Sequence, residues 1–327
     1  MRKKLVMLMI MFGLLLGACT QSENLSNKEK VDVTLVLDWS PNTNHTGIYV
    51  AEQMKFFEEV GLNVKIIQPP ADGAELMVAS GQADFGISFQ DTLAASFAEK
   101  LPVKAIASIM AHNTSGIVTL SDKKVTRAKQ LEGLTYATWD LPIEKAMVKQ
   151  IITDDGGNAD KLKMEPNTVT DIVSALQTTV DAVWVYEGWD GVAVKNAGLQ
   201  TNFLSFRELN PAFDYYTPVL ITNEQTLQHK SEVVKKLLSA LSKGYTYAAK
   251  HPKESADMLL KKVPELDRQL VEQSQEFVSK YYLDEGKPWG YIDKERWGKF
   301  YKWLNEQHIL KENIDEYTGF TNDFIAR

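Results

Sequence analysis

Cysteine is almost absent from this sequence, which contains a single one, Cys19, in 327 residues. One thiol cannot form an intrachain disulfide, and residues 20–327 contain no cysteine nucleophile and no thiolate metal ligand. The chain also lacks a G-x-S-x-G motif, a glycine-rich phosphate loop and a closely spaced pair of metal ligands. These absences count against catalysis. We predict a protein that is not an enzyme and has no catalytic residue, no cofactor and no metal site.

An excess of basic residues is also missing. The formal net charge is −7, and removing residues 1–18, with Arg2, Lys3 and Lys4, lowers Lys plus Arg from 36 to 33 against 43 Asp plus Glu. Acidic and basic residues are interspersed, whereas nucleic acid requires a basic surface, so no nucleic-acid partner is predicted. The remaining length exceeds one core of the usual size and predicts two lobes.

The N-terminal segment has the layout of a secretory signal. Three basic residues precede an apolar run over residues 5–16, which is short of the about 20 residues that a spanning helix needs. The ending "LGAC" at 16–19 resembles the bacterial lipobox, which implies cleavage before Cys19 and a lipid on its thiol. The alternative is an ordinary signal peptide with an incidental cysteine. We therefore predict a lipoprotein signal peptide at 1–18 and a flexible tether at 19–30.

Strand and helix patterns alternate along the rest of the chain. Strands are predicted at 33–37, 63–67, 83–88, 103–109, 116–120, 135–138, 161–165, 181–186, 202–206 and 216–222. Helices are predicted at about 47–59, 73–80, 91–99, 127–133, 142–156, 169–178 and 187–198, and then at 231–250, 252–262, 266–281 and 293–306. This order is typical of an α/β protein with mostly parallel sheets.

The chain completes one α/β series, builds a second and returns to helices. We predict lobe I at 31–115, lobe II at 116–215 and a return to lobe I at 216–327. Two lobes with crossing connections enclose a cleft. Ligands of open α/β sheets bind beyond the carboxyl ends of the strands, so the residues that follow each strand are the candidates for a site.

Several predicted strands end in an aromatic ring with a carboxylate or amide nearby. The groups are Asp38 and Trp39, then Phe89, Gln90 and Asp91, then Trp139 and Asp140, and finally Tyr186, Glu187 and Trp189. Core packing usually explains an isolated aromatic residue, and we assign Trp184, Trp289, Trp297 and Trp303 to it. The repeated pairing of ring and acid favours a shared ligand site instead.

The chemistry of these residue types narrows the ligand. Flat rings bind flat rings by stacking, and carboxylates accept hydrogen bonds from amino groups. The strand ends carry no Lys or Arg, which counts against phosphate, sulfonate or nitrate. A small, planar, amino-bearing heterocycle fits best. His45 and His112 follow strands and either line the cleft or lie exposed in loops, and "HNTSG" at 112–116 is a possible ligand or hinge loop.

Two stretches then identify a resemblance. "LDWSPNTNHTGIYVAEQMKFFEEVGLNVKI", followed by "GAELMVASGQADFGIS", closely resembles the thiamin-pyrimidine-binding and pyrimidine-synthase superfamily of substrate-binding proteins. The subgroup it is most similar to is the formylaminopyrimidine-binding lipoproteins of bacterial ABC importers. The most specific element is D-W-x-P-N-x-x-H-x-G at residues 38–47. The resemblance implies a two-lobed type II periplasmic-binding-protein fold with a hinged interlobe cleft.

The resemblance also implies a function without chemistry. The ligand would be N-formyl-4-amino-5-aminomethyl-2-methylpyrimidine, taken up for thiamin salvage. The protein would be a monomer held by its lipid on the extracytoplasmic face of the cell membrane. Closure of the lobes would bury the ligand and present a surface to an ABC permease and, through it, to an ATPase subunit. The ligand-binding residues expected are Asp38, Trp39, Asn42, His45, Gln90, Asn113, Ser115, Tyr186, Glu187 and Trp189.

Within that set, Trp39 and Tyr186 would sandwich the pyrimidine, and Glu187 and Asp38 would accept from its amino groups. Three alternatives share the fold. The eukaryotic synthase branch carries a cysteine-rich motif and consumes its own histidine, and His45 lies in the region that resembles that histidine site. A thiaminase-like hydrolase needs a cysteine nucleophile. Residues 20–327 contain no cysteine, so they offer neither the motif nor the nucleophile. A binding protein for another solute, such as an aliphatic sulfonate, is disfavoured by the missing cations.

Overall fold

The computed structural model describes residues 30–70 and 73–326. The predicted signal peptide at 1–18, the predicted lipid-attachment residue Cys19 and residues 20–29 of the predicted tether lie outside the described residues. Residues from Val31 onward form one compact unit. In the part of the chain that is described, no helix combines the length and the apolar character needed to span a membrane.

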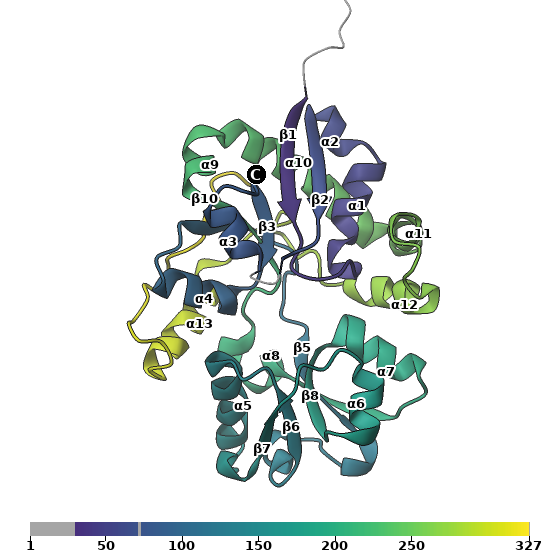
Figure 1. Cartoon of the computed structure of the whole chain (residues 1–327), viewed down its shortest axis with the longest axis vertical. Coiled ribbons are helices and arrows are strands. Elements are labelled where there is room, and N and C mark those ends of the chain that lie inside the picture. Colours follow the sequence, from purple (N-terminus) through teal and green to yellow (C-terminus); the bar gives the residue numbers. More distant parts are fainter. Residues whose placement is uncertain (1–29, 71–72, 327) are drawn as a thin grey trace, which may run out of the picture. The chain divides into compact units, whose positions relative to one another are not determined.

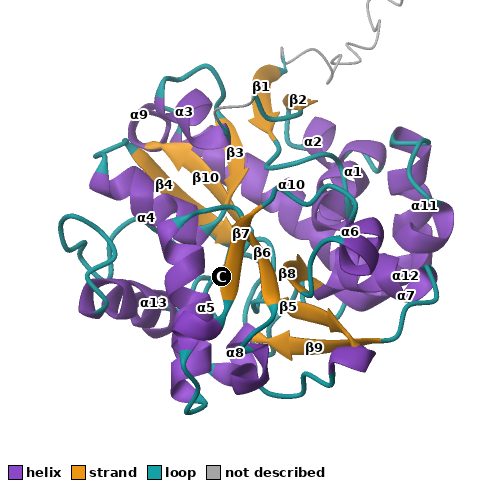
Figure 2. Ribbon diagram, turned by 60° about the horizontal axis from the view of Figure 1, so that its bottom comes forward, coloured by secondary structure: helices purple, strands orange, loops and turns teal. Residues whose placement is uncertain are grey.

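The first sheet has the strand order β2-β1-β3-β10-β4 (Figures 1 and 2). Its strands are β1 (Val31–Val36), β2 (Leu62–Ile67), β3 (Phe85–Ser88), β4 (Val103–Ser108) and β10 (Val219–Asn223). The first strand pairs in parallel with β2 and β3. In contrast, β10 is antiparallel to both of its neighbours, β3 and β4.

The second sheet repeats this plan with the order β7-β6-β8-β5-β9. Its strands are β5 (Ser115–Leu120), β6 (Thr135–Thr138), β7 (Lys163–Pro166), β8 (Ala182–Tyr186) and β9 (Thr201–Ser205). Strand β6 is parallel to β7 and to the central β8, whereas β5 is antiparallel to β8 and β9. Helices flank the strands of both sheets (Figure 2).

Each sheet is mixed, but four of its five strands run in the same direction, so the expectation of mostly parallel sheets is confirmed apart from one reversed strand in each. The antiparallel strands are the two that the chain enters on crossing from one lobe to the other. Ser115, the first residue of β5, pairs with Tyr186 at the end of β8, and Val219, the first of β10, pairs with Ser88 at the end of β3. A chain that enters a sheet at the edge where the parallel strands end must run against them.

Most helices agree with the predicted segments, but the segment predicted at 127–133 forms only a 3₁₀ turn, Ala128–Leu131, and the helices at 206–209 and 224–229 were not predicted. The helices are α1 (Thr46–Gln53), α2 (Phe56–Glu59), α3 (Ala74–Ala79), α4 (Gln90–Ala98), α5 (Pro142–Asp154), α6 (Ile172–Thr178), α7 (Val192–Asn196), α8 (Phe206–Leu209), α9 (Glu224–His229), α10 (Ser231–Lys250), α11 (Pro252–Lys262), α12 (Arg268–Val278) and α13 (Lys294–Glu306). The helix predicted at 47–59 is broken at Lys55, whose φ of 61° is left-handed. The helix predicted at 187–198 begins with a π-helical turn, Glu187–Gly191, before α7.

The core lies between the sheets and their covering helices. Trp184, Trp289, Trp297 and Trp303 are all buried, which confirms their assignment to packing. Trp289 stacks on Tyr245 of α10 with 4.6 Å between ring centroids. The four tryptophans therefore stabilise the lobes and are not available to a ligand.

The segments that cross between the two sheets are hydrogen-bonded to each other. The Asn113 side-chain amide donates to the Phe213 carbonyl at 2.8 Å, and the Asn113 backbone N–H donates to Asp214 Oδ1 at 3.0 Å. His112 Nδ1 lies 2.7 Å from Asp214 Oδ2. These contacts bind the segment before β5 to the segment before β10, so the "HNTSG" loop is part of the connection between the lobes.

Candidate functional site

The carboxyl edges of the two sheets approach each other. Phe89, which follows β3, stacks on Tyr186, the last residue of β8, with 6.4 Å between centroids and 24° between the ring planes. The Tyr186 hydroxyl lies 2.9 Å from Oγ1 of Thr217, just before β10. Because β1 is parallel to β3 and β6 to β8, the residues that follow all four strands share this junction.

In the loop after β1, a buried histidine contacts the side chain of Asp38. Asp38 Oδ1 lies 2.6 Å from Nε2 of His45, whose side chain is 1% exposed. His45 ends a 3₁₀ turn, Thr43–His45, whose N-cap is Asn42. The Asn42 side chain accepts from the Asn44 N–H at 2.9 Å, and His45 Nδ1 accepts from the Asn42 N–H at 3.2 Å. The polar residues of this loop thus form a cap that positions Asp38.

Residues of α10 and α12, and Tyr282 shortly after α12, are hydrogen-bonded to the same loop. The Tyr245 hydroxyl on α10 donates to the Asn44 carbonyl at 2.8 Å. The Tyr282 hydroxyl donates to the Thr43 carbonyl, and the Thr43 hydroxyl is hydrogen-bonded to Ser274 of α12. These contacts connect the loop to segments more than 200 residues away, which limits its freedom to move.

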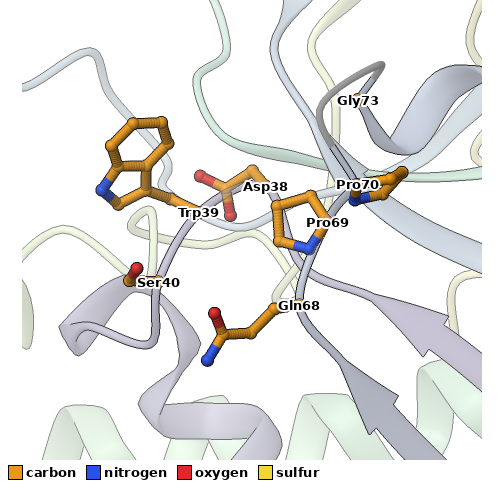
Figure 3. A pocket seen from close by; sticks show the side chains of 7 residues that line it. All are labelled: Asp38, Trp39, Ser40, Gln68, Pro69, Pro70 and Gly73. Carbon is orange, nitrogen blue, oxygen red and sulfur yellow. The ribbon is translucent and has the colours of Figure 1, made fainter.

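Beside Asp38 lies an open pocket of about 360 Å³ (Figure 3). Its lining residues are Asp38, Trp39, Ser40, Gln68, Pro69, Pro70 and Gly73. Trp39 is 61% exposed although it is the largest side chain in the loop. Figure 3 shows its indole beside the Asp38 carboxylate, with Pro69 on the other side. An exposed aromatic ring next to a fixed carboxylate offers stacking and hydrogen-bond acceptance at one place.

The opposite edge is formed by Tyr186 and the π-helical turn Glu187–Gly191, a rare geometry that is frequent at functional sites. Glu187 Oε1 lies 3.9 Å from Nζ of Lys195. Burial raises the pKa of the Glu187 carboxyl, although Lys195 and Arg207 oppose the shift. Trp189 is half-buried and packs against the apolar cluster that includes Leu260 and Val271.

The structure identifies a further acid, Asp91, at the same junction. Burial raises the pKa of Asp91 to about 6, and that of Asp190 to about 6 as well. Burial also raises the pKa of Tyr186, with smaller contributions from the negative charges of Asp91 and Asp38. Asp38, Asp91 and Asp190, which come from both lobes, are therefore close enough to Tyr186 for their charges to act on its hydroxyl. Asp91 follows a strand end in the sequence, and that position was the available signal.

Positive charge is scarce around these acids. Within residues 30–70 and 73–326, no Lys or Arg forms an ion pair with Asp38, Asp91 or Asp190. Lys195 and Arg207 lie beside Glu187, with the Arg207 guanidinium over the Tyr281 ring at 4.9 Å, and Lys145 forms an ion pair with Asp140 after β6. An electronegative junction lined by aromatic rings can accept hydrogen bonds from a ligand that carries amino groups.

Other predicted site residues serve the fold. Gln90 is fully buried; its amide donates to the Trp297 carbonyl at 2.9 Å and its Oε1 accepts from the Tyr216 N–H at 2.9 Å. Asn113 Oδ1 accepts from both the backbone N–H and the hydroxyl of Ser115. Like Asn42, these side chains already have protein partners. Over the described part of the chain, no three His, Cys, Asp or Glu residues form a group suited to a metal ion.

Comparison with known proteins agrees with this architecture. The family described as NMT1/THI5 like matches residues 42–255. The formylaminopyrimidine-binding protein of Halalkalibacterium halodurans is 26% identical over 98% of this chain and 99% of its own length. The 4-amino-5-hydroxymethyl-2-methylpyrimidine phosphate synthase of Legionella pneumophila is 25% identical over 90% of this chain and 93% of its own.

Among solved structures, the alkanesulfonate-binding protein SsuA from Xanthomonas axonopodis pv. citri, bound to MOPS, superposes with a TM-score of 0.69. It covers 90% of this chain and 99% of its own, and at 11% identity the likeness concerns the fold. The two-lobed periplasmic-binding-protein fold implied by the sequence is thereby confirmed. Since the family match extends over more than half of the sequence, the chain belongs to the NMT1/THI5-like family.

Proposed function

We propose that this chain is an extracytoplasmic substrate-binding lipoprotein of an ABC importer. Its ligand is N-formyl-4-amino-5-aminomethyl-2-methylpyrimidine or a related thiamin pyrimidine, taken up for thiamin salvage. The relative from Halalkalibacterium halodurans, which is named as a formylaminopyrimidine-binding protein, supports the ligand class over nearly the full length of both chains.

One structural observation carries the proposal. Trp39 is 61% exposed beside a carboxylate, Asp38, which a buried histidine holds in place. The negative charge of Asp38 contributes to the raised pKa of Tyr186, at the end of β8 in the other sheet. Such an arrangement suits a flat heterocycle that stacks on a ring and donates hydrogen bonds to acids at its rim. The fold supplies two lobes that can close on it, and a permease with its ATPase subunit would receive the ligand.

The alternative functions would require different residues in the same chain. The Legionella pneumophila relative is named as a synthase. This chain contains no cysteine after Cys19 and therefore lacks the cysteine-rich motif that the resemblance assigns to the eukaryotic synthase branch. A sulfonate would meet Asp38, Asp91 and Asp190 without a Lys or Arg paired to them among the described residues. We therefore favour binding without catalysis, and an amino-bearing ligand over an anion.

The replacement Glu187→Gln distinguishes a pyrimidine from a sulfonate. It exchanges a carboxylate for an amide of the same shape, so an aminopyrimidine should lose a charge-assisted hydrogen bond worth about 1.4 kcal/mol or more, which is about tenfold in affinity. A short alkanesulfonate should bind no worse, or better, once a negative charge is removed. Titration calorimetry of both proteins with both ligands provides the comparison.

Lys195→Gln is the matched control, because it removes the cation that lies 3.9 Å from Glu187 without changing the acid itself. It should leave pyrimidine binding in place. Unchanged pyrimidine affinity in Glu187→Gln would exclude Glu187 from the site. Tight sulfonate binding by the wild type would contradict the proposed function as a whole.

Lipid attachment at Cys19 is tested separately. The basic, apolar and "LGAC" segments of the leader predict a thioether-linked lipid on that residue. Cys19→Ser should yield a chain that is either released from membranes or left unprocessed, and that takes up no radiolabelled fatty acid. Fractionation and metabolic labelling of wild type and variant measure this. A wild-type chain without fatty acid would refute the anchor while leaving the ligand assignment intact.

A further inference from the structure

Both ring nitrogens of His45 are already engaged within the protein. Nδ1 accepts from the Asn42 backbone N–H at 3.2 Å, and a backbone amide can only donate. The proton of the neutral imidazole must therefore be on Nε2. Nε2 in turn lies 2.6 Å from Asp38 Oδ1, so the histidine donates and the carboxylate accepts.

The surrounding chain prevents His45 from taking another role. Its side chain is 1% exposed, and the 3₁₀ turn that carries it is bonded to Tyr245 and Tyr282 through the carbonyls of Asn44 and Thr43. Turning the ring toward the pocket would break the bonds to both Asn42 and Asp38. A direct contact between His45 and a ligand, which the sequence suggested, would therefore require the loop to rearrange.

We propose that His45 is a positioning residue that acts on the ligand through Asp38. By donating to Oδ1, it fixes the carboxylate and keeps it as an acceptor. Among the described residues, Asp38 Oδ2 has no hydrogen-bond partner, and Asp38 lines the pocket beside Trp39. The pair thereby selects a ligand that brings its own donor, such as an exocyclic amino group, and rejects one that offers only acceptors.

The choice of probe rests on the proposed function, since formylaminopyrimidine carries the amino group that Oδ2 would accept. The positioning role itself rests on the contacts of His45. Two replacements of similar shape each keep one of these contacts and remove the other. In His45→Asn, the side-chain oxygen stands near Nδ1 and can still accept from Asn42, but the donor to Asp38 is lost. In His45→Gln, the amide nitrogen stands near Nε2 and can still donate to Asp38.

Titration calorimetry with formylaminopyrimidine, together with urea unfolding of each free protein, should show opposite patterns. We expect His45→Asn to bind about tenfold more weakly while it unfolds near the wild-type midpoint, because Asp38 is no longer held. His45→Gln should retain most of the affinity and lose stability, because the Asn42 N–H is left without its acceptor. A glutamine variant that binds as weakly as the asparagine variant would overturn the proposal.

A double-mutant cycle with Asp38→Asn then tests whether His45 acts through Asp38. In the Asp38→Asn background, His45→Asn should cost little further affinity, since the residue it positions is gone. Equal losses in both backgrounds would show that His45 acts independently and would refute the proposal. If the wild type binds no pyrimidine, the function fails, yet ¹⁵N NMR of the imidazole still decides the positioning: the proton must be on Nε2, and a proton on Nδ1 contradicts the inference.

Discussion

Trp39→Ala is expected to weaken aminopyrimidine binding by roughly ten- to a hundredfold, because stacking of a heterocycle on an aromatic side chain contributes about 1–3 kcal/mol. The free energy of unfolding of the unliganded protein should change by less than about 0.5 kcal/mol, since a side chain that is 61% exposed contributes little to the core. A buried tryptophan would behave differently, at a cost of about 3–5 kcal/mol on truncation to alanine. Calorimetry and urea unfolding measure the two quantities.

Tyr317→Ala is the matched control for the loss of an exposed ring. Tyr317 is 42% exposed and packs on α13, where its ring meets Gly298 and the Lys294 ammonium. It should leave ligand affinity unchanged. If Trp39→Ala bound the pyrimidine as well as the control did, Trp39 would not be part of the site. Tyr186→Ala is a poorer test, because its ring stacks on Phe89 and its hydroxyl is bonded to Thr217.

Asp91→Asn is expected to change stability and affinity in opposite directions. Burial raises the pKa of Asp91 from 3.8 to about 6, so at neutral pH the folded protein holds an ionised carboxylate in an unfavourable setting. One pKa unit corresponds to about 1.4 kcal/mol, and the neutral amide should stabilise the free protein by about 1–3 kcal/mol at pH 7. Asparagine can still accept from the Thr92 N–H, as Asp91 Oδ1 does at 3.0 Å.

The gain in stability should depend on pH with a definite sign. Because the folded protein holds the Asp91 proton more tightly than the unfolded chain, the stability that this proton contributes is present below the unfolded pKa of 3.8 and is lost as the pH rises through about 6. The advantage of Asp91→Asn should accordingly vanish in acid and grow toward neutrality. An exposed acid, Asp160, provides the control substitution Asp160→Asn, which should show neither effect.

Ligand binding should respond to Asp91→Asn in the reverse sense. A cationic or amino-bearing ligand loses an acidic partner and should bind about tenfold more weakly or worse. Urea unfolding over a range of pH and calorimetry at neutral pH measure the two effects. A variant that is less stable than wild type at neutral pH, with unchanged affinity, would show that Asp91 is an ordinary structural carboxylate.

Local patterns predicted the elements well where periodicity was strong. The strand at 135–138 is β6, and the helix at 231–250 is α10, because alternation and a 3.6-residue repeat mark buried faces directly. The direction of a strand within its sheet cannot be predicted from such patterns. β5 and β10 read as ordinary buried strands, and only their entry from the other lobe makes them antiparallel. The break at Lys55 also lacked a local signal, since no Gly or Pro stands there.

Position along the chain alone predicted which side chains the fold brings together. Asp38, Trp39, Tyr186 and Glu187 follow strands, and the fold brings those strand ends to one junction. Gln90 was as plausible by the same rule, yet its amide is bonded to residues 126 and 207 positions away in the chain. Polar residues with such distant partners cannot be told from ligand contacts by sequence. The role of His45 likewise depends on the hydrogen-bond partner of each ring nitrogen, which the sequence does not specify.

The central claim is that the junction of the two lobes holds a planar, amino-bearing pyrimidine. The most direct measurement is competition followed by mass spectrometry. The wild-type protein is incubated with equal amounts of formylaminopyrimidine, thiamin and a short alkanesulfonate. Unbound solute is removed, the protein is denatured, and the released molecule is identified by its mass. The account predicts that formylaminopyrimidine is retained in preference to the others. Retention of the sulfonate, or of none of the three, would contradict it.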